Sequence, residues 1–128
     1  MNEPIWITLA NVAVIHARQL ALFGGQAGVR DEGMLRSALD RPRNKWAYGE
    51  SDICTLAAAY AFGIAKNHPF IDGNKRAAFG VMALFLVKNG VRITLPNPDV
   101  VRMMLQLAAG ELSEAELAAW IAGTSRPG

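Results

Sequence analysis

Residues 67–87, NHPFIDGNKRAAFGVMALFLV, change from polar and charged residues to an unbroken apolar run directly after Arg76. The apolar part, Ala77 to Val87, is shorter than the roughly 20 residues that a membrane span requires, so it predicts a helix buried in a protein core. Lys75 and Arg76 stand at the expected start of that helix. Helix starts carry partial positive charge and usually attract acidic residues, so two cations here require a reason.

Two more helices are predicted ahead of this segment. Apolar residues recur at helical spacing between Ile7 and Phe23 and stop at a pair of glycines. Asp31 is placed to cap a second, short helix. Arg41–Pro42 is expected to end it, because the residue before a proline is disfavoured in the helical conformation. The polar stretch that follows is expected to form a loop or a short hairpin.

Capping signals predict three further helices. The residues expected to cap these helices are Ser51 or Asp52 for the first, Asn97 with Pro98 for the second, and Ser113 with Glu116 for the third. The first of these helices is apolar nearly all round and belongs in the middle of a bundle. VRITL, residues 91–95, is β-branched and alternating, which allows one brief extended piece. The chain is therefore expected to be a single all-α domain over residues 1–128, a compact bundle of about six helices.

Composition excludes several classes of protein. The chain has 128 residues, of which 52% are hydrophobic and 19% charged, which fits one folded domain rather than a disordered chain. Its net charge of +2 is too small to predict direct nucleic-acid binding by bulk attraction. Cys54 is the only cysteine, so no intramolecular disulfide can form, and it lies in an apolar pattern typical of an inert thiol. Without a signal-peptide or membrane-span pattern, we expect a cytoplasmic protein.

The residues at the start of the central helix predict an anion site. Asp72–Gly73 breaks the chain there, and successive backbone N–H groups at a helix start suit a phosphate. A phosphate would account for the two cations, with Lys75 as a mobile point charge and Arg76 able to hold two oxygens at once. Asn74 would add a neutral donor.

Two neighbouring residues fit chemistry on a bound phosphate. His68, beside Pro69, is a natural general base for a hydroxyl. Asp72 supplies an oxygen ligand of the kind that Mg²⁺ prefers when phosphates also bind it. Together with the anion site, these are the parts that phosphoryl or nucleotidyl transfer requires. Taken singly, His68 is more often a packed or capping residue, Asp72 a turn residue, and Lys75 and Arg76 solvated charges.

HPFIDGNKR, residues 68–76, resembles the signature of the Fic/Doc superfamily, H-P-F-x-[DE]-G-N-x-R. The wider chain is similar to the Doc (death-on-curing) branch. The segments that carry this similarity, in the order in which that branch shows them, are GGQAGVRDEGMLRSALDRP (24–42), LAAAYAFGIAKNHPFIDGNKRAAF (56–79) and LAAGELSEAELAAWI (107–121).

The resemblance implies a fold and a site. The fold would be a small helical bundle with a short β-hairpin flap, which we expect within Arg43 to Ser51. The implied roles are His68 as general base, Asp72 as Mg²⁺ ligand, Gly73, Asn74, Lys75 and Arg76 as the phosphate nest, Phe70 as the core anchor of the loop, and Lys45, Trp46 and Tyr48 as substrate contacts on the flap.

Two departures from the adenylylating Fic pattern, G-N-G-R-x-x-R, bear on the reaction. Lys75 replaces the second glycine, and Phe79 stands where the second arginine would be. Both changes are similar to those in Doc toxins, which transfer the γ-phosphate of ATP. The resemblance thus implies a Mg²⁺- and ATP-dependent protein kinase that blocks translation by phosphorylating a threonine of elongation factor Tu. An adenylyltransferase and a catalytically silent partner-binding domain remain as alternatives.

The resemblance also implies a toxin–antitoxin system with a Phd-like antitoxin as partner. Other residues are expected to be structural: His16 bonding a neighbouring loop, and Arg30 fixing a loop. Met103, Met104 and Leu107 have helical spacing and are expected in the core, with part of that surface available to the antitoxin.

Overall fold

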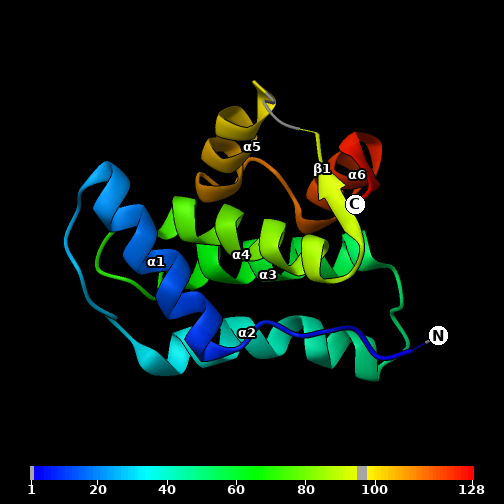
Figure 1. The fold of residues 1–128 in the computed structure, drawn as a ribbon, viewed down its shortest axis with the longest axis horizontal. Helices are drawn as coiled ribbons and strands as arrows, with labels where there is room; N and C mark the ends of the chain where they lie inside the picture. Colours follow the sequence, from blue (N-terminus) through cyan, green and yellow to red (C-terminus); the bar gives the residue numbers. More distant parts are fainter. Residues whose placement is uncertain (1, 95–97) are drawn as a thin grey trace.

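A computed structural model describes residues 2–94 and 98–128 of the chain (Figure 1). These residues form α1 (Leu9–Phe23), α2 (Glu32–Ala47), α3 (Ile53–Asn67), α4 (Asn74–Lys88), β1 (Val91–Ile93), α5 (Asp99–Ala108), α6 (Glu114–Thr124) and β2 (Ser125–Pro127). The expected bundle of about six helices is therefore confirmed. None of the helices in the described ranges combines the length and the apolar character that crossing a bilayer demands.

Helices α3 and α4 lie side by side at the centre of the molecule (Figure 1). Helix α2 packs on α3 from one side, α5 and α6 lie on the opposite side, and α1 crosses α4. This arrangement follows from the sequence, because α3 and α4 are apolar around most of their circumference and can be covered on several faces at once. Their largest fully buried side chains include Tyr60 and Phe85, whose rings lie 5.0 Å apart.

Small residues on α3 allow α2 to approach closely. Gly63 faces Ala38, and a Cβ atom at position 63 would lie only 3.1 Å from the Ala38 Cα atom. Ala57, Ala58 and Ala61 are fully buried on the same helix. This close contact holds α3 against α2, and the C-terminus of α3 leads into the loop that carries His68.

Local capping explains where most helices begin. Asp31 accepts from the Met34 N–H at 3.0 Å, and Asp52 accepts from the Cys54 N–H at 3.3 Å. Ser113 and Glu116 form the reciprocal capping box that their spacing predicts. The expected cap Asn97 lies outside the described residues.

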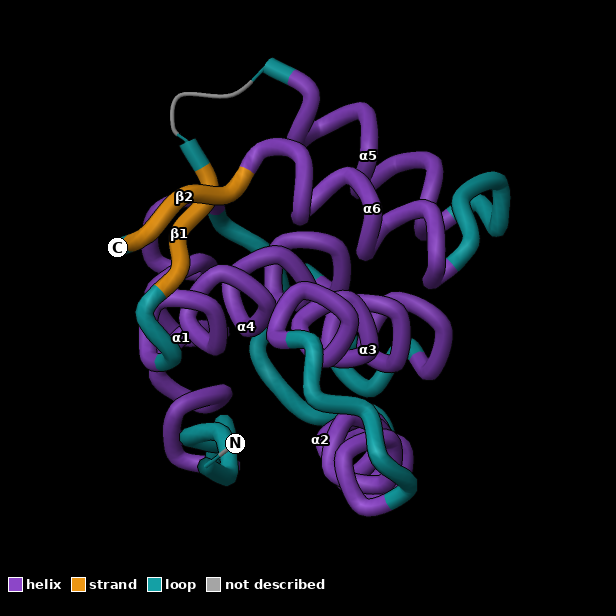
Figure 2. The backbone as a smooth tube through the Cα atoms, turned by 90° about the vertical axis from the view of Figure 1, so that its right-hand side faces the viewer, coloured by secondary structure: helices purple, strands orange, loops and turns teal. Residues whose placement is uncertain are grey.

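A two-stranded antiparallel sheet closes one end of the bundle (Figure 2). Strand β1 pairs with β2 so that Arg92 lies opposite Arg126. The brief extended piece expected near residue 91 is thereby confirmed. Its partner is the C-terminal segment of the chain.

The prediction that a hairpin flap lies within residues 43–51 is wrong. Helix α2 continues through Pro42 to Ala47, so Lys45 and Trp46 are helical, and only the turn at Tyr48 and Gly49 follows. A proline inside a helix removes one hydrogen bond. Pro42 is fully buried, and Trp46 packs edge-on against Trp6 with ring centroids 6.2 Å apart. Tertiary packing thus outweighs the local preference to stop at Arg41–Pro42.

Candidate functional site

The loop between α3 and α4, residues 68–73, carries the sequence motif and begins with a strained residue. His68 caps the C-terminus of α3 in the left-handed conformation, with φ 52° and ψ 53°. Among the described residues, no other non-glycine residue has a positive φ. Such conformations are costly and persist where surrounding structure holds them, often at functional sites.

Arg30 holds the His68 backbone in place. Its Nε donates to the His68 carbonyl oxygen at 2.8 Å, and its Nη2 donates to the Asn67 carbonyl oxygen at 3.0 Å. These are terminal carbonyl groups of α3, which lack partners within the helix. The expectation that Arg30 fixes a loop is confirmed.

Residues 24–31 form a second loop that pairs with the motif loop. The N–H groups of Arg30 and Asp31 donate to the Pro69 carbonyl oxygen at 2.7 and 3.1 Å. The Ile71 N–H donates to the Gly28 carbonyl oxygen at 3.1 Å. This pairing was not predicted from the sequence. The signal in the sequence is Gly28, whose φ of 125° is a conformation that other residues rarely adopt.

Phe70 anchors the motif loop in the core, as expected. Its side chain is buried and stacks on the imidazole of His16, with centroids 4.0 Å apart and planes at 16°. The His16 Nε2 donates to the Asp72 carbonyl oxygen at 2.8 Å. His16 therefore bonds a neighbouring loop, which confirms the structural role expected for it.

The side chain of Asn74 is committed to the loop rather than to a ligand. Its Oδ1 accepts from the Phe70 N–H at 2.9 Å, and its Nδ2 donates to the Phe70 carbonyl oxygen at 2.9 Å. The same Nδ2 lies 3.1 Å from His68 Nδ1. Only 4% of Asn74 is exposed. The Asn74 amide is therefore bonded within the loop, while its backbone N–H lies in the first turn of α4, and the expected role of Asn74 in phosphate binding stays a prediction.

The first turn of α4 leaves its backbone donors available. Gly73 precedes the helix with φ 77°, and the first helical bond runs from the Ala77 N–H to the Gly73 carbonyl oxygen at 2.9 Å. No acceptor within the described residues meets the N–H groups of residues 74–76, and no side chain caps this helix. Lys75 and Arg76 are both exposed beside them. The result is a positively charged nest that suits an anion.

Asp72 stands at the rim of this nest. Its Oδ2 accepts from the Gln26 N–H at 3.2 Å, and its Oδ1 accepts from the Gly73 N–H at 2.8 Å. These bonds, the one from Gln26 first, lower the pKa of the Asp72 carboxyl below its ordinary value, and the charge of Arg76 acts in the same direction. The carboxylate is exposed and ionised, and each oxygen keeps a lone pair for a cation.

One cavity of about 340 Å³ brings the motif residues together. It is lined by His68, Ile71, Asp72, Gly73, Asn74, Lys75 and Arg76. Comparison with known families gives a match to the family described as Fic/DOC over residues 6–86, a range that includes both loops and all but the last two residues of α4.

The chain belongs to the Fic/DOC family.

Two relatives place it near the Doc branch of that family. The "Protein kinase doc" of Escherichia phage P1 is 30% identical over 113 residues, which cover 88% of this chain and 89% of that protein. The "Toxin Doc" of Mycolicibacterium smegmatis is 37% identical over 107 residues, which cover 79% of this chain and 81% of that protein.

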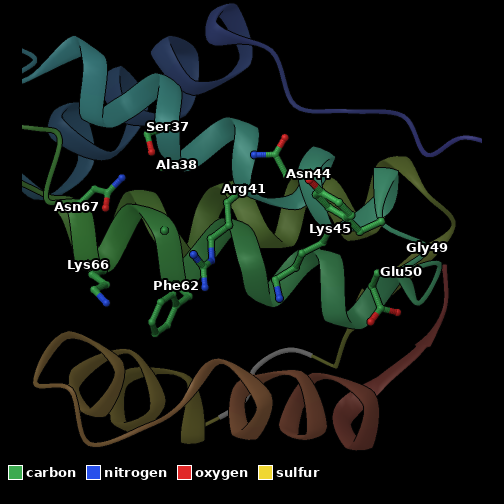
Figure 3. Close-up of a pocket in the computed structure, with 12 residues that line it drawn as sticks. Ser37, Ala38, Arg41, Asn44, Lys45, Gly49, Glu50, Phe62, Lys66 and Asn67 are labelled. Atoms are coloured by element: carbon green, nitrogen blue, oxygen red, sulfur yellow. The ribbon is translucent and has the colours of Figure 1, made fainter.

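A larger, polar cleft of about 670 Å³ lies along α2 and α3 in this Fic/DOC chain (Figure 3). It starts at Asn67, the neighbour of His68, and runs to the turn at Gly49 and Glu50. Lys45 and Tyr48, two of the residues expected on a flap, line this cleft, and the Tyr48 side chain is fully open to solvent. Trp46 does not line it.

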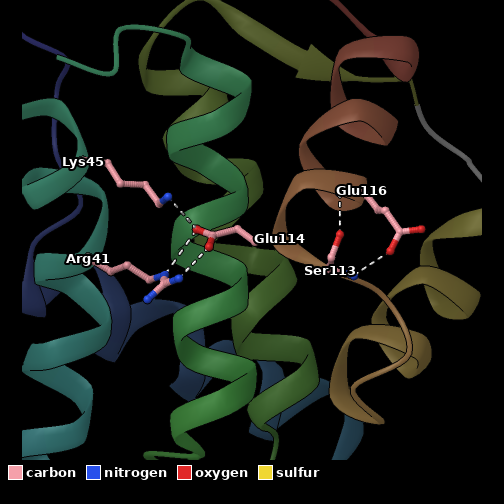
Figure 4. A network of polar contacts seen from close by, with 5 residues as sticks. All are labelled: Arg41, Lys45, Ser113, Glu114 and Glu116. Atoms are coloured by element: carbon pink, nitrogen blue, oxygen red, sulfur yellow. Dashed lines mark hydrogen bonds and ion pairs between the residues drawn. The ribbon is translucent and has the colours of Figure 1, made fainter. Parts of the chain in front are cut away.

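Helix α6 fixes the wall of this cleft. Glu114 accepts from Arg41 Nη2 at 2.6 Å and from Nε at 3.2 Å, and Lys45 Nζ lies 3.6 Å from the same carboxylate (Figure 4). A bidentate ion pair of this kind fixes the relative orientation of its two side chains. It holds α2 against α6 while leaving Lys66, on the opposite wall, exposed.

An apolar groove of about 490 Å³ adjoins the nest on its other side. It is lined by Gln19, Phe23, Lys75, Arg76, Phe79, Val100, Val101, Met104 and Leu105. Arg76 lines both this groove and the motif cavity, and its guanidinium lies 4.8 Å from the centre of the Phe23 ring. Met103, Met104 and Leu107 are buried, as expected, while Val101 and Leu105 stay exposed on the same helix.

Proposed function

We propose that this chain is a Doc-type toxin that acts as a protein kinase and transfers the γ-phosphate of ATP to a hydroxyl group of a translation factor. The observation that carries this proposal is the open first turn of α4, flanked by Lys75 and Arg76, in one cavity with His68 and Asp72. The names of the two relatives, a protein kinase and a toxin, support it. By resemblance, the acceptor is a threonine of elongation factor Tu, which implies a cytoplasmic location.

The nest is proposed to bind the phosphates of ATP. The backbone N–H groups of residues 74–76 supply donors at the positive end of α4. Arg76 adds a planar group able to bond two phosphate oxygens, and Lys75 adds a mobile charge. Gly73 matters for its left-handed backbone, which turns the first N–H groups outward.

Asp72 is proposed to bind Mg²⁺. The residues fit this role, because the carboxylate is ionised, exposed and held by two backbone N–H groups beside the nest. The described residues contain no cluster of three acidic, histidine or cysteine side chains that could hold a metal by themselves. A magnesium ion bound through one carboxylate would take its other ligands from phosphate and water, and it would neutralise phosphate charge during transfer.

His68 is proposed as the general base. Its imidazole is exposed in the same cavity as the nest, and its backbone is fixed by Arg30. In the step proposed here, His68 takes the proton of the acceptor hydroxyl while the oxygen attacks the γ-phosphorus and ADP leaves.

Lys75 and Phe79 favour transfer of phosphate over transfer of AMP. Lys75 places a long charged side chain where adenylylating relatives have glycine, and Phe79 lines the apolar groove instead of offering a second phosphate contact. An adenylyltransferase is the second candidate, and a silent partner-binding domain is the third.

The polar cleft beside His68 is proposed to receive the protein substrate. Lys45 and Tyr48 at its far end would contact the segment that presents the hydroxyl, although both belong to the end of α2 and its turn rather than to a hairpin. Lys66 lies on the path between them and His68.

The apolar groove is proposed to receive a segment of a Phd-like antitoxin. It shares Lys75 and Arg76 with the nest, so a segment seated on Val101 and Leu105 would lie beside the phosphate site and obstruct it. Exposed apolar residues gathered in a groove are typical of a protein interface.

Two labelled nucleotides test the reaction. The protein is incubated with a translating lysate and ATP labelled at either the γ- or the α-phosphate, with His68→Ala as the inactive control. Label from γ-ATP alone on one protein supports the kinase. Label from α-ATP establishes the adenylyltransferase instead, and no transfer with unimpaired cell growth on expression favours the silent domain.

A further inference from the structure

The orientation of the Asn74 amide follows from the backbone groups that it meets. The Phe70 N–H can only donate, and it lies 2.9 Å from the atom that must therefore be the amide oxygen. The Phe70 carbonyl oxygen can only accept, and it lies 2.9 Å from the amide nitrogen. Both ends of the amide are thus assigned by partners of fixed polarity.

This orientation decides what Asn74 offers to His68. The amide nitrogen carries two hydrogens and no lone pair for accepting, and one hydrogen is directed to Phe70. The other is available to His68 Nδ1, which lies 3.1 Å away. A hydrogen bond at this position requires Nδ1 to be the acceptor. Because a neutral imidazole carries one hydrogen, that hydrogen is on Nε2.

We infer that Asn74 holds neutral His68 in its Nε2–H tautomer, so the free chain presents a hydrogen-bond donor at the nitrogen that faces away from Asn74. The opposite tautomer would set the Nδ1 hydrogen against the Asn74 amide hydrogens. Turning the amide over would relieve that contact, but it would set the nitrogen against the Phe70 N–H and the oxygen against the Phe70 carbonyl oxygen. Asn74 is 4% exposed, so water has little access to replace these bonds.

The consequence for catalysis rests on the proposed function, whereas the tautomer itself does not. To accept a proton at Nε2, His68 must first break its bond from Asn74 so that Nδ1 can meet water. It then releases its Nε2 hydrogen to water and receives another at Nδ1. The bare Nε2 then takes the hydroxyl proton, which leaves an imidazolium ring as the oxygen bonds to phosphorus. Asn74 is a positioning residue that keeps the free chain in a form whose Nε2 cannot accept a proton.

Long-range ¹⁵N–¹H correlation spectra of the histidine rings test the tautomer directly. The full-length ¹⁵N-labelled protein is recorded without nucleotide at mildly alkaline pH, where free histidine is neutral. The chain has two histidines, and His68→Gln assigns the signals by removing one set. His16 serves as the reference, since its Nε2 donates to a carbonyl oxygen. We expect a protonated Nε2 and a bare Nδ1 for His68. A protonated Nδ1, or an equal mixture of the two forms, overturns the inference.

Asn74→Asp tests whether residue 74 is the cause. The carboxylate still accepts from the Phe70 N–H but turns an acceptor towards Nδ1, so we expect the hydrogen to move to Nδ1. A folded Asn74→Asp protein that keeps the Nε2–H signals contradicts the assignment to Asn74. If this variant does not fold, the wild-type spectrum decides alone. Absence of phosphate transfer together with the expected spectrum refutes the proposed function and leaves this inference standing.

Discussion

His16 stacks on Phe70 with ring centroids 4.0 Å apart, and its Nε2 donates to the carbonyl oxygen of Asp72 at 2.8 Å. One buried side chain on α1 therefore holds both the anchor of the motif loop and the residue proposed to bind Mg²⁺. His16 is not among the residues that line the motif cavity, so its effect on activity would act through the loop.

His16→Phe should preserve the stacking and remove the donor. Leaving the Asp72 carbonyl without its partner is expected to lower the free energy of unfolding by about 1 kcal/mol. The proposed phosphate transfer should slow by a larger factor, because the loop carrying Asp72 and Gly73 loses a fixed point. Urea unfolding and kcat are measured on the same preparation. His16→Gln, which keeps a donor, should retain more activity, and equal losses in the two variants would contradict this role.

Arg30→Lys should weaken the site although it keeps the charge. Lysine cannot bond the carbonyl oxygens of His68 and Asn67 through a planar group, so the strained backbone of His68 loses support. We expect a fall in kcat and a loss of about 1 kcal/mol in the free energy of unfolding. Arg36→Lys is the control, because Arg36 makes an exposed ion pair with Glu32, and this change should alter stability by less than about 0.5 kcal/mol.

The lowered pKa of Asp72 predicts how stability depends on pH. A carboxyl with a lower pKa in the folded than in the unfolded state contributes stability above its unfolded pKa, and that contribution is lost as the pH falls through the folded pKa. The stability difference between wild type and Asp72→Asn should therefore be present at pH 7. It should shrink as the pH is lowered below about 4, the ordinary range of aspartate. Urea unfolding of both proteins at pH 7 and below about pH 4 measures this stability difference. A difference that does not change with pH would exclude the carboxylate charge as its source.

Gly63→Val tests the close contact of α2 and α3. The new side chain would meet the Ala38 backbone, so we expect a loss of about 1–3 kcal/mol in the free energy of unfolding. Gly123→Val is the matched control in α6, where no atom lies within 4 Å of an added Cβ. Thermal and urea unfolding compare the two. Similar losses would show that backbone propensity rather than packing explains the effect.

Lys66→Glu tests the polar cleft as the substrate surface. If the acceptor protein lies along this cleft, reversing the charge should raise KM for the protein substrate and leave KM for ATP unchanged, because Lys66 lies outside the nest. Arg18→Glu is the control, since Arg18 is exposed on α1 and lines neither cavity. An effect of Lys66→Glu on KM for ATP alone would contradict the proposed division of the two cavities.

Much of the fold could be predicted from local signals in the sequence. Asp31, Asp52 and the Ser113–Glu116 box cap helices where their spacing indicates, because capping depends on residues within one turn. Pro42 could not be judged in this way. Its local cost is offset by the burial of its ring in the folded chain, which depends on tertiary structure, so α2 runs on to Ala47 and no flap forms there.

The site was predictable to a similar extent. The motif identified His68, Asp72 and the first turn of α4, and the structure brings them into one cavity. The motif did not indicate that the amide of Asn74 is buried against Phe70, because residue type alone does not distinguish a side-chain donor from a backbone donor. The pairing of the loop at Gly28 with Ile71 was missed for a related reason, since it joins two irregular segments far apart in the sequence.

Mass spectrometry of proteins modified during expression tests the central claim most directly. Wild-type protein and His68→Ala are expressed in parallel, and the translation machinery is examined for peptides whose mass differs between them. The account predicts one threonine or serine that carries a single phosphate in the wild-type cells and is unmodified with His68→Ala. An added AMP at that position, or a phosphate that persists with His68→Ala, would contradict it.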